Sequence, residues 1–309
     1  MAFSPIFKII VFVGIMYTFN SFKISITKNK NLLLYNTKNY KQCIISSKNK
    51  KSYCNEAEEF FLVENESIIN KKLITISPGG YKGFYLLGIL TYLKENYETD
   101  DFVFSGASAG AWNSLFMCYK GDPMTFVYNF LDVNIRKAKS ITELQYFLKY
   151  KLLSCYKTDD FDLNKLFIGV TTFKRFIPNI NIYTDFEDLE DAINCCMASS
   201  HIPLITGGIT NRYKNMFSFD GGFSKYPYLD KERLLHISLS MWDELKGINN
   251  NTNFLKQNLL NIKKFSEFFS LSKNNLLELF DNGYQDAKIH KQYFDDILDR
   301  KFDEDTPEF

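Results

Sequence analysis

Two stretches of the chain decide its fold: KLITISPGGYKGFYLLGILTYLKENY at residues 72–97, and DFVFSGASAGAWNSLFMCYK at residues 101–120. Each begins with a short run of β-favouring residues, passes through small residues, and continues with apolar residues at helical spacing. Each therefore predicts a strand, a tight turn and a helix. Strands that alternate with helices favour an α/β fold with a mainly parallel sheet covered by helices on both faces.

The same alternation continues toward the C-terminus. Helical spacing recurs over 125–139, 142–156 and 187–200, and amphipathic helix is expected over 253–298. Further strands are predicted over 168–176 and 179–186, which form a pair turning at Pro178, and over 217–219 and 234–242. In such a sheet, ligands gather at the carboxyl ends of the strands.

Composition excludes several classes of protein. The 309 residues are 45% hydrophobic, which is enough to bury a sizeable core and excludes a disordered chain. The formal net charge is only +1 and arginine is scarce, so a nucleic-acid partner is not expected. Six cysteines and three histidines are spread without a zinc-binding spacing, so no metal site is predicted.

The N-terminus carries a different signal. Residues 1–22 hold an eleven-residue apolar run after Lys8, which predicts a secretory signal or membrane anchor; an ordinary buried helix or strand is the alternative. Residues 23–71 are expected to form a polar linker, in which Cys43 and Cys54 could pair in an oxidising compartment. The main α/β domain at 72–298 and an acidic tail at 299–309 complete the predicted organisation, with membrane association and a secretory route left open.

The segment Gly106-Ala107-Ser108-Ala109-Gly110 falls at the second strand-to-helix turn. A serine at such a turn sits on a strained elbow that exposes its hydroxyl, and small neighbours are needed because strand and helix backbones approach closely. The pentapeptide alone is a weak signal, since a plain tight turn would look the same. The apolar strand before it and the apolar helix after it favour a nucleophile elbow.

The segment from Pro78 to Gly83 lies at the first strand-to-helix turn. Glycines there let backbone N–H groups point toward a developing oxyanion, which is a large contribution to acyl-transfer catalysis. The alternatives are a phosphate-binding loop, whose residue order is not present, and a turn without a ligand.

Asp220, followed by Gly221 and Gly222, ends another predicted strand. A carboxylate there could act directly as the general base for Ser108. A serine-histidine-acid triad would instead need His236 or His290, and neither falls in a loop at a strand's carboxyl end. His201 precedes Asp220 and fits the usual triad order badly, so a Ser-Asp dyad is favoured.

Together, the glycine loop, GASAG at 106–110, ASSHIP at 198–203 and DGG at 220–222 resemble the patatin-like phospholipases, as does GYQDA at 283–287. The resemblance covers about residues 72–290 and implies a three-layer α/β/α fold. It implies Ser108 as nucleophile and Asp220 as base. The oxyanion donors it implies are Gly79, Gly80 and Ala109, and the positions that support the motifs are Lys82, Gly83, Gly106, Gly110, Gly221 and Gly222.

The resemblance implies a lipid acyl hydrolase that cleaves phospholipid or acylglycerol esters at a membrane surface, without a cofactor or metal. Pro78 departs from the family pattern because it replaces a glycine and removes one N–H. A conventional Ser-His-Asp esterase, a non-catalytic lipid-binding scaffold and an acyltransferase remain as alternatives.

Overall fold

The computed structural model describes residues 43–48, 52–54, 68, 70–174, 177–224, 226–245 and 275–301. Its strands are β1 (Cys43–Ser46), β2 (Ser52–Cys54), β3 (Lys72–Ile76), β4 (Phe102–Gly106), β5 (Leu166–Lys174), β6 (Ile177–Thr184), β7 (Asn211–Tyr213), β8 (Met216–Phe219) and β9 (Arg233–Ile237). Its helices are α4 (Gly83–Asn96), α5 (Ala109–Met117), α6 (Pro123–Phe130), α7 (Val133–Arg136), α8 (Ile141–Cys155), α9 (Leu189–Ser199), α10 (Met241–Leu245), α13 (Leu276–Ile289) and α14 (Lys291–Asp295).

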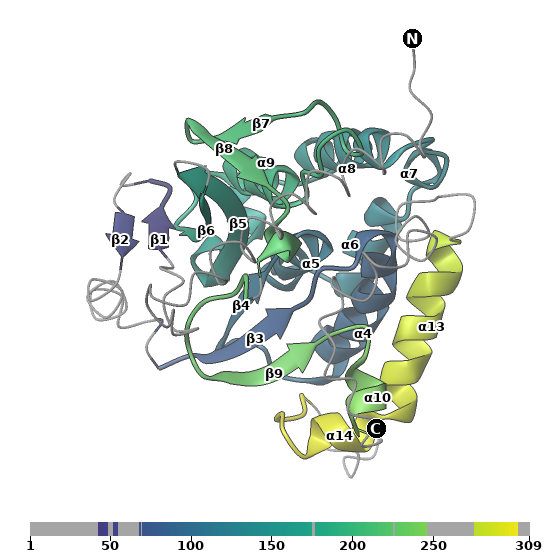
Figure 1. Cartoon of the computed structure of the whole chain (residues 1–309). Coiled ribbons are helices and arrows are strands. Elements are labelled where there is room, and N and C mark those ends of the chain that lie inside the picture. Colours follow the sequence, from purple (N-terminus) through teal and green to yellow (C-terminus); the bar gives the residue numbers. More distant parts are fainter. Residues whose placement is uncertain are drawn as a thin grey trace, which may run out of the picture.

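The strands form one sheet in the order β2-β1-β6-β5-β4-β3-β9, with β8 paired to β5 and β7 to β8 (Figure 1). Its centre is parallel, because β4 pairs in parallel with both β3 and β5, and β3 pairs in parallel with β9. Antiparallel pairs such as β5–β6 lie toward one side. Helices lie on both sides of the sheet, so the predicted α/β fold with a mainly parallel central sheet is confirmed.

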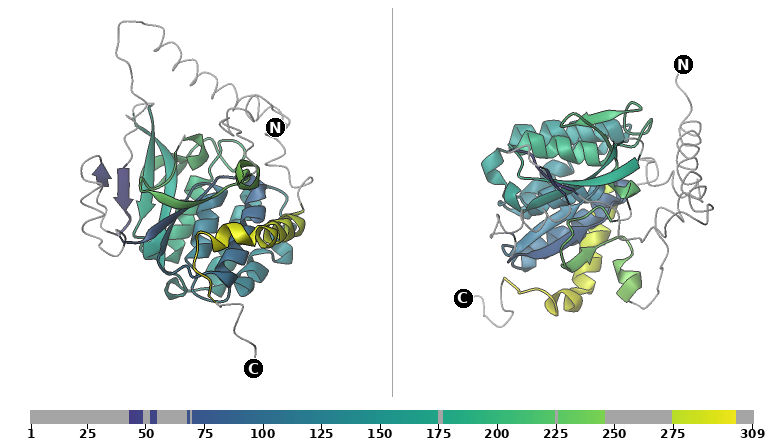
Figure 2. Two further views of the ribbon diagram at one scale, coloured as in Figure 1. Left: turned by 90° about the horizontal axis from the view of Figure 1, so that it is seen from below. Right: turned by 60° about the vertical axis from the view of Figure 1, so that its left-hand side comes forward.

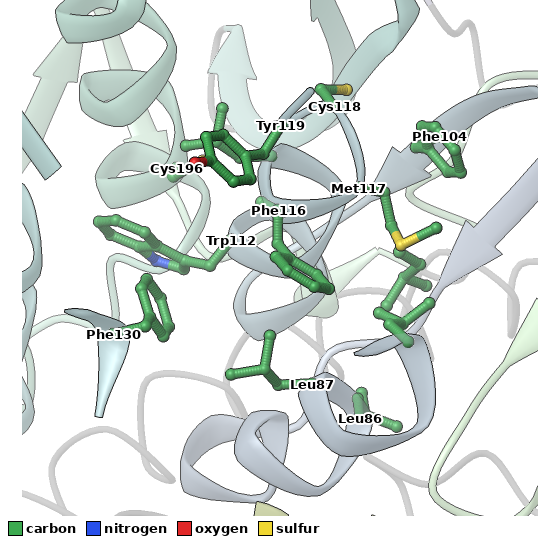
Figure 3. Packing of buried hydrophobic residues seen from close by; sticks show 14 of the residues in the cluster. Leu86, Leu87, Phe104, Trp112, Phe116, Met117, Cys118, Tyr119, Phe130 and Cys196 are labelled. Atoms are coloured by element: carbon green, nitrogen blue, oxygen red, sulfur yellow. The ribbon is translucent and has the colours of Figure 1, made fainter. Parts of the chain in front are cut away.

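The core forms where α5 packs on the sheet beside α4 and α9. Figure 3 shows Trp112 and Phe116 extending from α5, with Phe130 beside Trp112. The Phe116 ring also packs 5.1 Å, centroid to centroid, from Phe126. Such pairs of buried aromatic rings add to the stabilisation that burial of their apolar area provides.

Two predicted strands differ in detail. Pro178 is not in the turn but lies in β6, opposite Phe173 of β5. Over the described residues, the other neighbour, β1, pairs with β6 only from Asn181 onward, so no pairing on that side is shown at Pro178, which is where a strand accepts a proline. The strand predicted to run to Trp242 ends at Ile237, and α10 begins after Ser238 and Ser240, whose hydroxyls approach each other to 3.4 Å in the turn.

The expected linker also needs correction, because residues within 23–71 join the sheet. β1 pairs in parallel with β6, opposite the β9 edge (Figures 1 and 2). Ile44 is buried in a small cluster with Val103 and Ile182, which explains why this part of a Lys- and Asn-rich stretch is held. Cys43 is disulfide-bonded, and Cys54 is its Cα partner in the β1–β2 register.

The predictions for residues 1–22 and for most of the C-terminal tail lie outside the described residues. Within the described part of the chain, none of the helices combines the length and the hydropathy needed to cross a bilayer.

Helix α13 packs along α4 at an unusually close approach (Figure 1). A Cβ atom on Gly283 of α13 would lie 1.9 Å from the Tyr85 carbonyl oxygen, and one on Gly88 of α4 would lie 2.1 Å from the Phe280 carbonyl oxygen. The Tyr85 hydroxyl also donates a 2.6 Å hydrogen bond to Asp286 on α13. The GYQDA segment therefore serves to dock α13 on the core.

We predict that Gly283→Ala lowers the free energy of unfolding by about 2 kcal/mol or more, because the two helices must separate and lose packing. Thermal unfolding followed by circular dichroism measures the effect. Asn282→Ala, an exposed change on the same helix, is the matched control and is expected to shift Tm little. Equal Tm values for the two variants would contradict the close-packing account.

Candidate active site

Ser108 occupies the strained turn between β4 and α5. Its backbone has φ 55° and ψ −125°, a left-handed conformation that a residue with a side chain rarely adopts. The turn is tight because Gly110 touches the end of β3: a Cβ there would lie 2.1 Å from the Ile76 carbonyl oxygen. The elbow predicted from the sequence is present, and it holds the Ser108 hydroxyl at the carboxyl end of the parallel strands.

The Ser108 hydroxyl donates a 2.6 Å hydrogen bond to Oδ2 of Asp220. Asp220 follows β8 and comes from a segment more than a hundred positions along the chain. Its other carboxylate oxygen accepts a 2.7 Å hydrogen bond from the Gly222 N–H. Its own N–H donates a 2.7 Å bond to the His201 carbonyl. Both carboxylate oxygens of Asp220 therefore accept a hydrogen bond, one of them from the Ser108 hydroxyl, and this fixes the orientation of the carboxylate.

Burial shapes the chemistry of Asp220. The residue is 4% exposed, and removal of its carboxyl from water raises its pKa to about 6, although the hydrogen bonds from Ser108 and Gly222 lower it. A carboxylate with that pKa is mostly ionised at neutral pH, yet it is more basic than an exposed aspartate. Such a group is suited to take a proton from a hydroxyl.

Ser199, at the end of α9, links the Ser108 turn to strand β5 through its hydroxyl. Its hydroxyl accepts a 2.9 Å hydrogen bond from the Ser108 N–H and donates a 2.6 Å bond to the Gly169 carbonyl of β5. The sequence showed ASSHIP only as part of the family pattern. Its first serine links the nucleophile turn to the sheet, a role that only the three-dimensional contact reveals.

The glycine loop forms a short 3-10 turn at Gly80–Lys82 between β3 and α4. Gly80 has φ 53°, which favours glycine at this position. Gly80 and Ala109 both line the pocket that contains Ser108. Ala109 is the first residue of α5, so its N–H has no acceptor within the helix. Gly79 is buried beside the pocket rather than in its lining, and the Lys82 side chain is exposed.

The remaining predicted glycines serve packing around these groups. A Cβ on Gly83 would lie 2.6 Å from that of Ala109, and one on Gly106 would lie 2.1 Å from the Gly110 carbonyl oxygen. A Cβ on Gly221 would lie 2.3 Å from the Gly169 carbonyl oxygen. These positions let the loop, the elbow and the Asp220 turn approach one another.

An apolar pocket opens from the Ser108 hydroxyl. The cavity itself measures about 50 Å³, and it opens into a wider hollow of about 530 Å³ that includes open solvent. Besides the residues around Ser108, its walls are formed by side chains of α4, α5, α6 and α8 and of the segment after α9, namely Phe84, Trp112, Asn113, Phe130, Ile141, Leu144, Gln145, Leu148, Ser200 and Ile202. Sequence periodicity indicated that α6 and α8 are helices but not that their apolar faces meet over the serine.

The histidines lie apart from the dyad. His236 approaches Thr75 Oγ1 through Nδ1 at 2.8 Å, and burial lowers its pKa to about 4. His290 stacks on Trp242, with ring centroids 4.2 Å apart. His201 contacts Thr206 through its ring, and only its backbone carbonyl reaches Asp220. Over the described residues, no histidine nitrogen bonds Ser108 or the Asp220 carboxylate.

In the described ranges, no three histidine, cysteine or carboxylate side chains gather closely enough to hold a metal ion. Cys118, Cys195 and Cys196 are buried, and burial raises their pKa values.

Comparison with known proteins gives a family and weak structural likenesses. The model of the family described as patatin-like phospholipase matches residues 74–230, which include the glycine loop, the elbow and Asp220. No curated protein matches the chain. The solved structure of the heterodimeric complex ExoU-SpcU from the type III secretion system of Pseudomonas aeruginosa is similar at 13% identity and a TM-score of 0.28; the match covers 74% of this chain and 60% of that one.

We predict that Asp220→Asn raises Tm by a few degrees above pH 6. The folded pKa of about 6 exceeds the ordinary 3.8, so the folded state binds the proton more tightly, and stability falls as pH rises from about 4 to about 6. Above that window the buried charge costs about 3 kcal/mol, which the amide removes. Calorimetry across pH measures it.

The exposed change Asp230→Asn is the matched control and should leave Tm nearly constant. Near pH 4 the Tm of Asp220→Asn should approach that of the wild type. A Tm of Asp220→Asn below that of the wild type at pH 7 would contradict the buried-charge account.

Proposed function

Because the chain belongs to the patatin-like phospholipase family, whose members hydrolyse lipid esters, we propose that it cleaves fatty-acyl esters with Ser108 as nucleophile and Asp220 as its base. The observation that carries the proposal is the 2.6 Å hydrogen bond from the Ser108 hydroxyl to the buried Asp220 carboxylate. Ser108 also has a strained backbone, and the Asp220 carboxylate is held in place by the Gly222 N–H. Both features are typical of a functional serine rather than of an ordinary surface serine.

In the proposed reaction, Asp220 Oδ2 takes the proton from Ser108 Oγ while Oγ attacks the ester carbonyl carbon. Asp220 then gives this proton to the leaving alcohol oxygen as the C–O bond breaks, leaving an acyl-enzyme. In the second half, water gives a proton to Asp220 and attacks the acyl carbon, and the proton returns to Ser108 as the fatty acid leaves. Activity is therefore lost as pH falls through the Asp220 pKa of about 6.

The negative charge on the carbonyl oxygen needs donors beside Ser108. We assign the backbone N–H groups of Gly80 and Ala109, since both residues line the pocket. Gly79, the other donor that the resemblance implies, is buried next to them and has no place in the lining. Because it lies in the same loop, we keep its N–H as a proposed third donor. Lys82 is exposed, and we assign it a role in supporting the loop rather than in the reaction.

The pocket wall formed by Trp112, Phe130 and Leu148 is apolar and suits a fatty-acyl chain, while the charged Asp220 lies beside the reacting Ser108. Phospholipids and acylglycerols both carry such chains. We further propose that the protein works at a membrane surface, attached through the apolar segment within residues 1–22. The support for attachment is the apolar run in the sequence.

We predict fatty-acid release from mixed phospholipid and triacylglycerol vesicles with calcium chelated. Ser108→Ala and Asp220→Asn should each lower the rate by about 10³-fold or more, because each removes one member of the dyad. The histidine variants His201→Gln, His236→Gln and His290→Gln are the controls, and they should retain most of the chemistry.

Loss of release in the His236→Gln or His290→Gln variant, with its fold intact by circular dichroism, would favour a Ser-His-Asp esterase. Absence of release from folded wild-type protein would contradict the hydrolase and favour a scaffold. Transfer of the acyl group to an added alcohol acceptor, faster than its release to water, would indicate an acyltransferase.

A further inference from the structure

Gln145 of α8 differs from every other polar side chain in the pocket wall. The other four are each bonded within the protein: Ser108 to Asp220, Asn113 to the Gly83 carbonyl, and Ser200 to the Trp112 indole N–H and the Cys196 carbonyl. The Gln145 carboxamide makes no hydrogen bond to the part of the chain that the structure describes. Yet the residue is only 5% exposed.

The surroundings of Gln145 are hydrocarbon. Its neighbours on the same face of α8 are Ile141, Leu144 and Leu148, and all three line the same pocket as Ser108. A carboxamide carries two N–H donors and one oxygen acceptor, which need partners once water is removed. An acyl chain that filled this pocket would leave both kinds of group unpaired.

The fold itself does not need this amide. Methionine has nearly the same size and equal helix propensity, and it would fill the space between Leu144 and Leu148 without unpaired groups. Among the described residues, the polar side-chain atoms closed off from solvent without a partner are Tyr81 Oη, Ser114 Oγ, His201 Nε2 and Ser218 Oγ, so the Gln145 amide is open to the pocket. A few such polar groups in a mostly apolar pocket fix the orientation of a ligand, which supplies their hydrogen-bond partner.

We propose that the Gln145 carboxamide binds a hydroxyl group of the lipid ester, so that the enzyme selects hydroxyl-bearing lipids over plain hydrocarbon esters. This rests on the proposed function and specifies its substrate class. A hydroxyl fits because it can donate to the amide oxygen and accept from an amide N–H at once. The hydroxyl has two sources: the free glycerol position of a partly acylated lipid, or a hydroxylated acyl chain.

The test compares kcat/KM for three kinds of ester. Propyl palmitate carries no hydroxyl, monopalmitoylglycerol carries it on the alcohol side, and propyl hydroxypalmitates carry it near the ester, at mid-chain or near the methyl end. Wild-type protein should prefer one hydroxyl-bearing class by about tenfold or more, because a site with an unpaired polar group rejects a substrate that cannot pair with it. The preferred class identifies the source of the hydroxyl.

Gln145→Met should reduce that preference to near unity, mainly through faster hydrolysis of propyl palmitate. Its Tm should equal or exceed that of the wild type, because an unpaired amide is removed from the interior. Leu148→Met, on the same pocket face, is the matched control and should change kcat/KM for all esters by a common factor. A wild-type preference near unity, or a preference that survives Gln145→Met, would overturn the proposal.

Binding separates this proposal from the hydrolase itself. Ser108→Ala protein is titrated with hexadecyl glyceryl ether, hexadecyl propyl ether and its chain-hydroxylated analogues, with and without Gln145→Met. If binding shows a Gln145-dependent preference for a hydroxyl but the wild type hydrolyses no ester, the hydroxyl subsite is supported and the proposed hydrolase activity is contradicted. If the wild type hydrolyses the esters but neither assay shows this preference, the hydroxyl subsite is contradicted and the hydrolase activity is supported.

Discussion

The contact between the Ser108 hydroxyl and the Asp220 carboxylate is the constraint around which the site is organised. The two residues come from different strand ends, β4 and β8, and both strands adjoin β5. Ser199 joins the Ser108 N–H to the Gly169 carbonyl of β5, and the His201 carbonyl receives the Asp220 N–H. The end of α9 and the residues after it thus hold both Ser108 and Asp220. This explains how the 2.6 Å hydrogen bond between them is kept although the Ser108 backbone is strained.

This site costs stability in more than one way. Ser108 has a left-handed backbone, and Asp220 carries a buried charge. Each is unfavourable by itself, and the core below must offset them. The close approach of α13 to α4 and the aromatic packing around α5 provide apolar burial on helices α4 and α5, which also supply pocket residues. Backbone strain and a buried charge therefore meet in the site, where they favour the reaction.

Much of this could be predicted from the sequence, because the decisive signals are local. The turns at Pro78–Gly83 and Gly106–Gly110 each follow a β-rich run and precede a helix. The positions of the three histidines in the sequence already disfavoured a Ser-His-Asp triad. Contacts between distant segments could not be predicted. β1 lies in a polar stretch whose pairing with β6 depends on long-range register. The meeting of α6 and α8 over Ser108, and the place of Gln145 there, depend on which helix faces pack together, and periodicity does not contain that information.

The most direct measurement is the rate of covalent labelling by a fluorophosphonate, followed by peptide mass spectrometry as a function of pH. If Asp220 activates Ser108 without a histidine, the label lies on Ser108, its rate rises with an apparent pKa near 6, and Asp220→Asn abolishes it while His201→Gln, His236→Gln and His290→Gln do not. A label on another residue, or a Ser108 label whose rate survives Asp220→Asn but is lost with a histidine, would contradict the dyad.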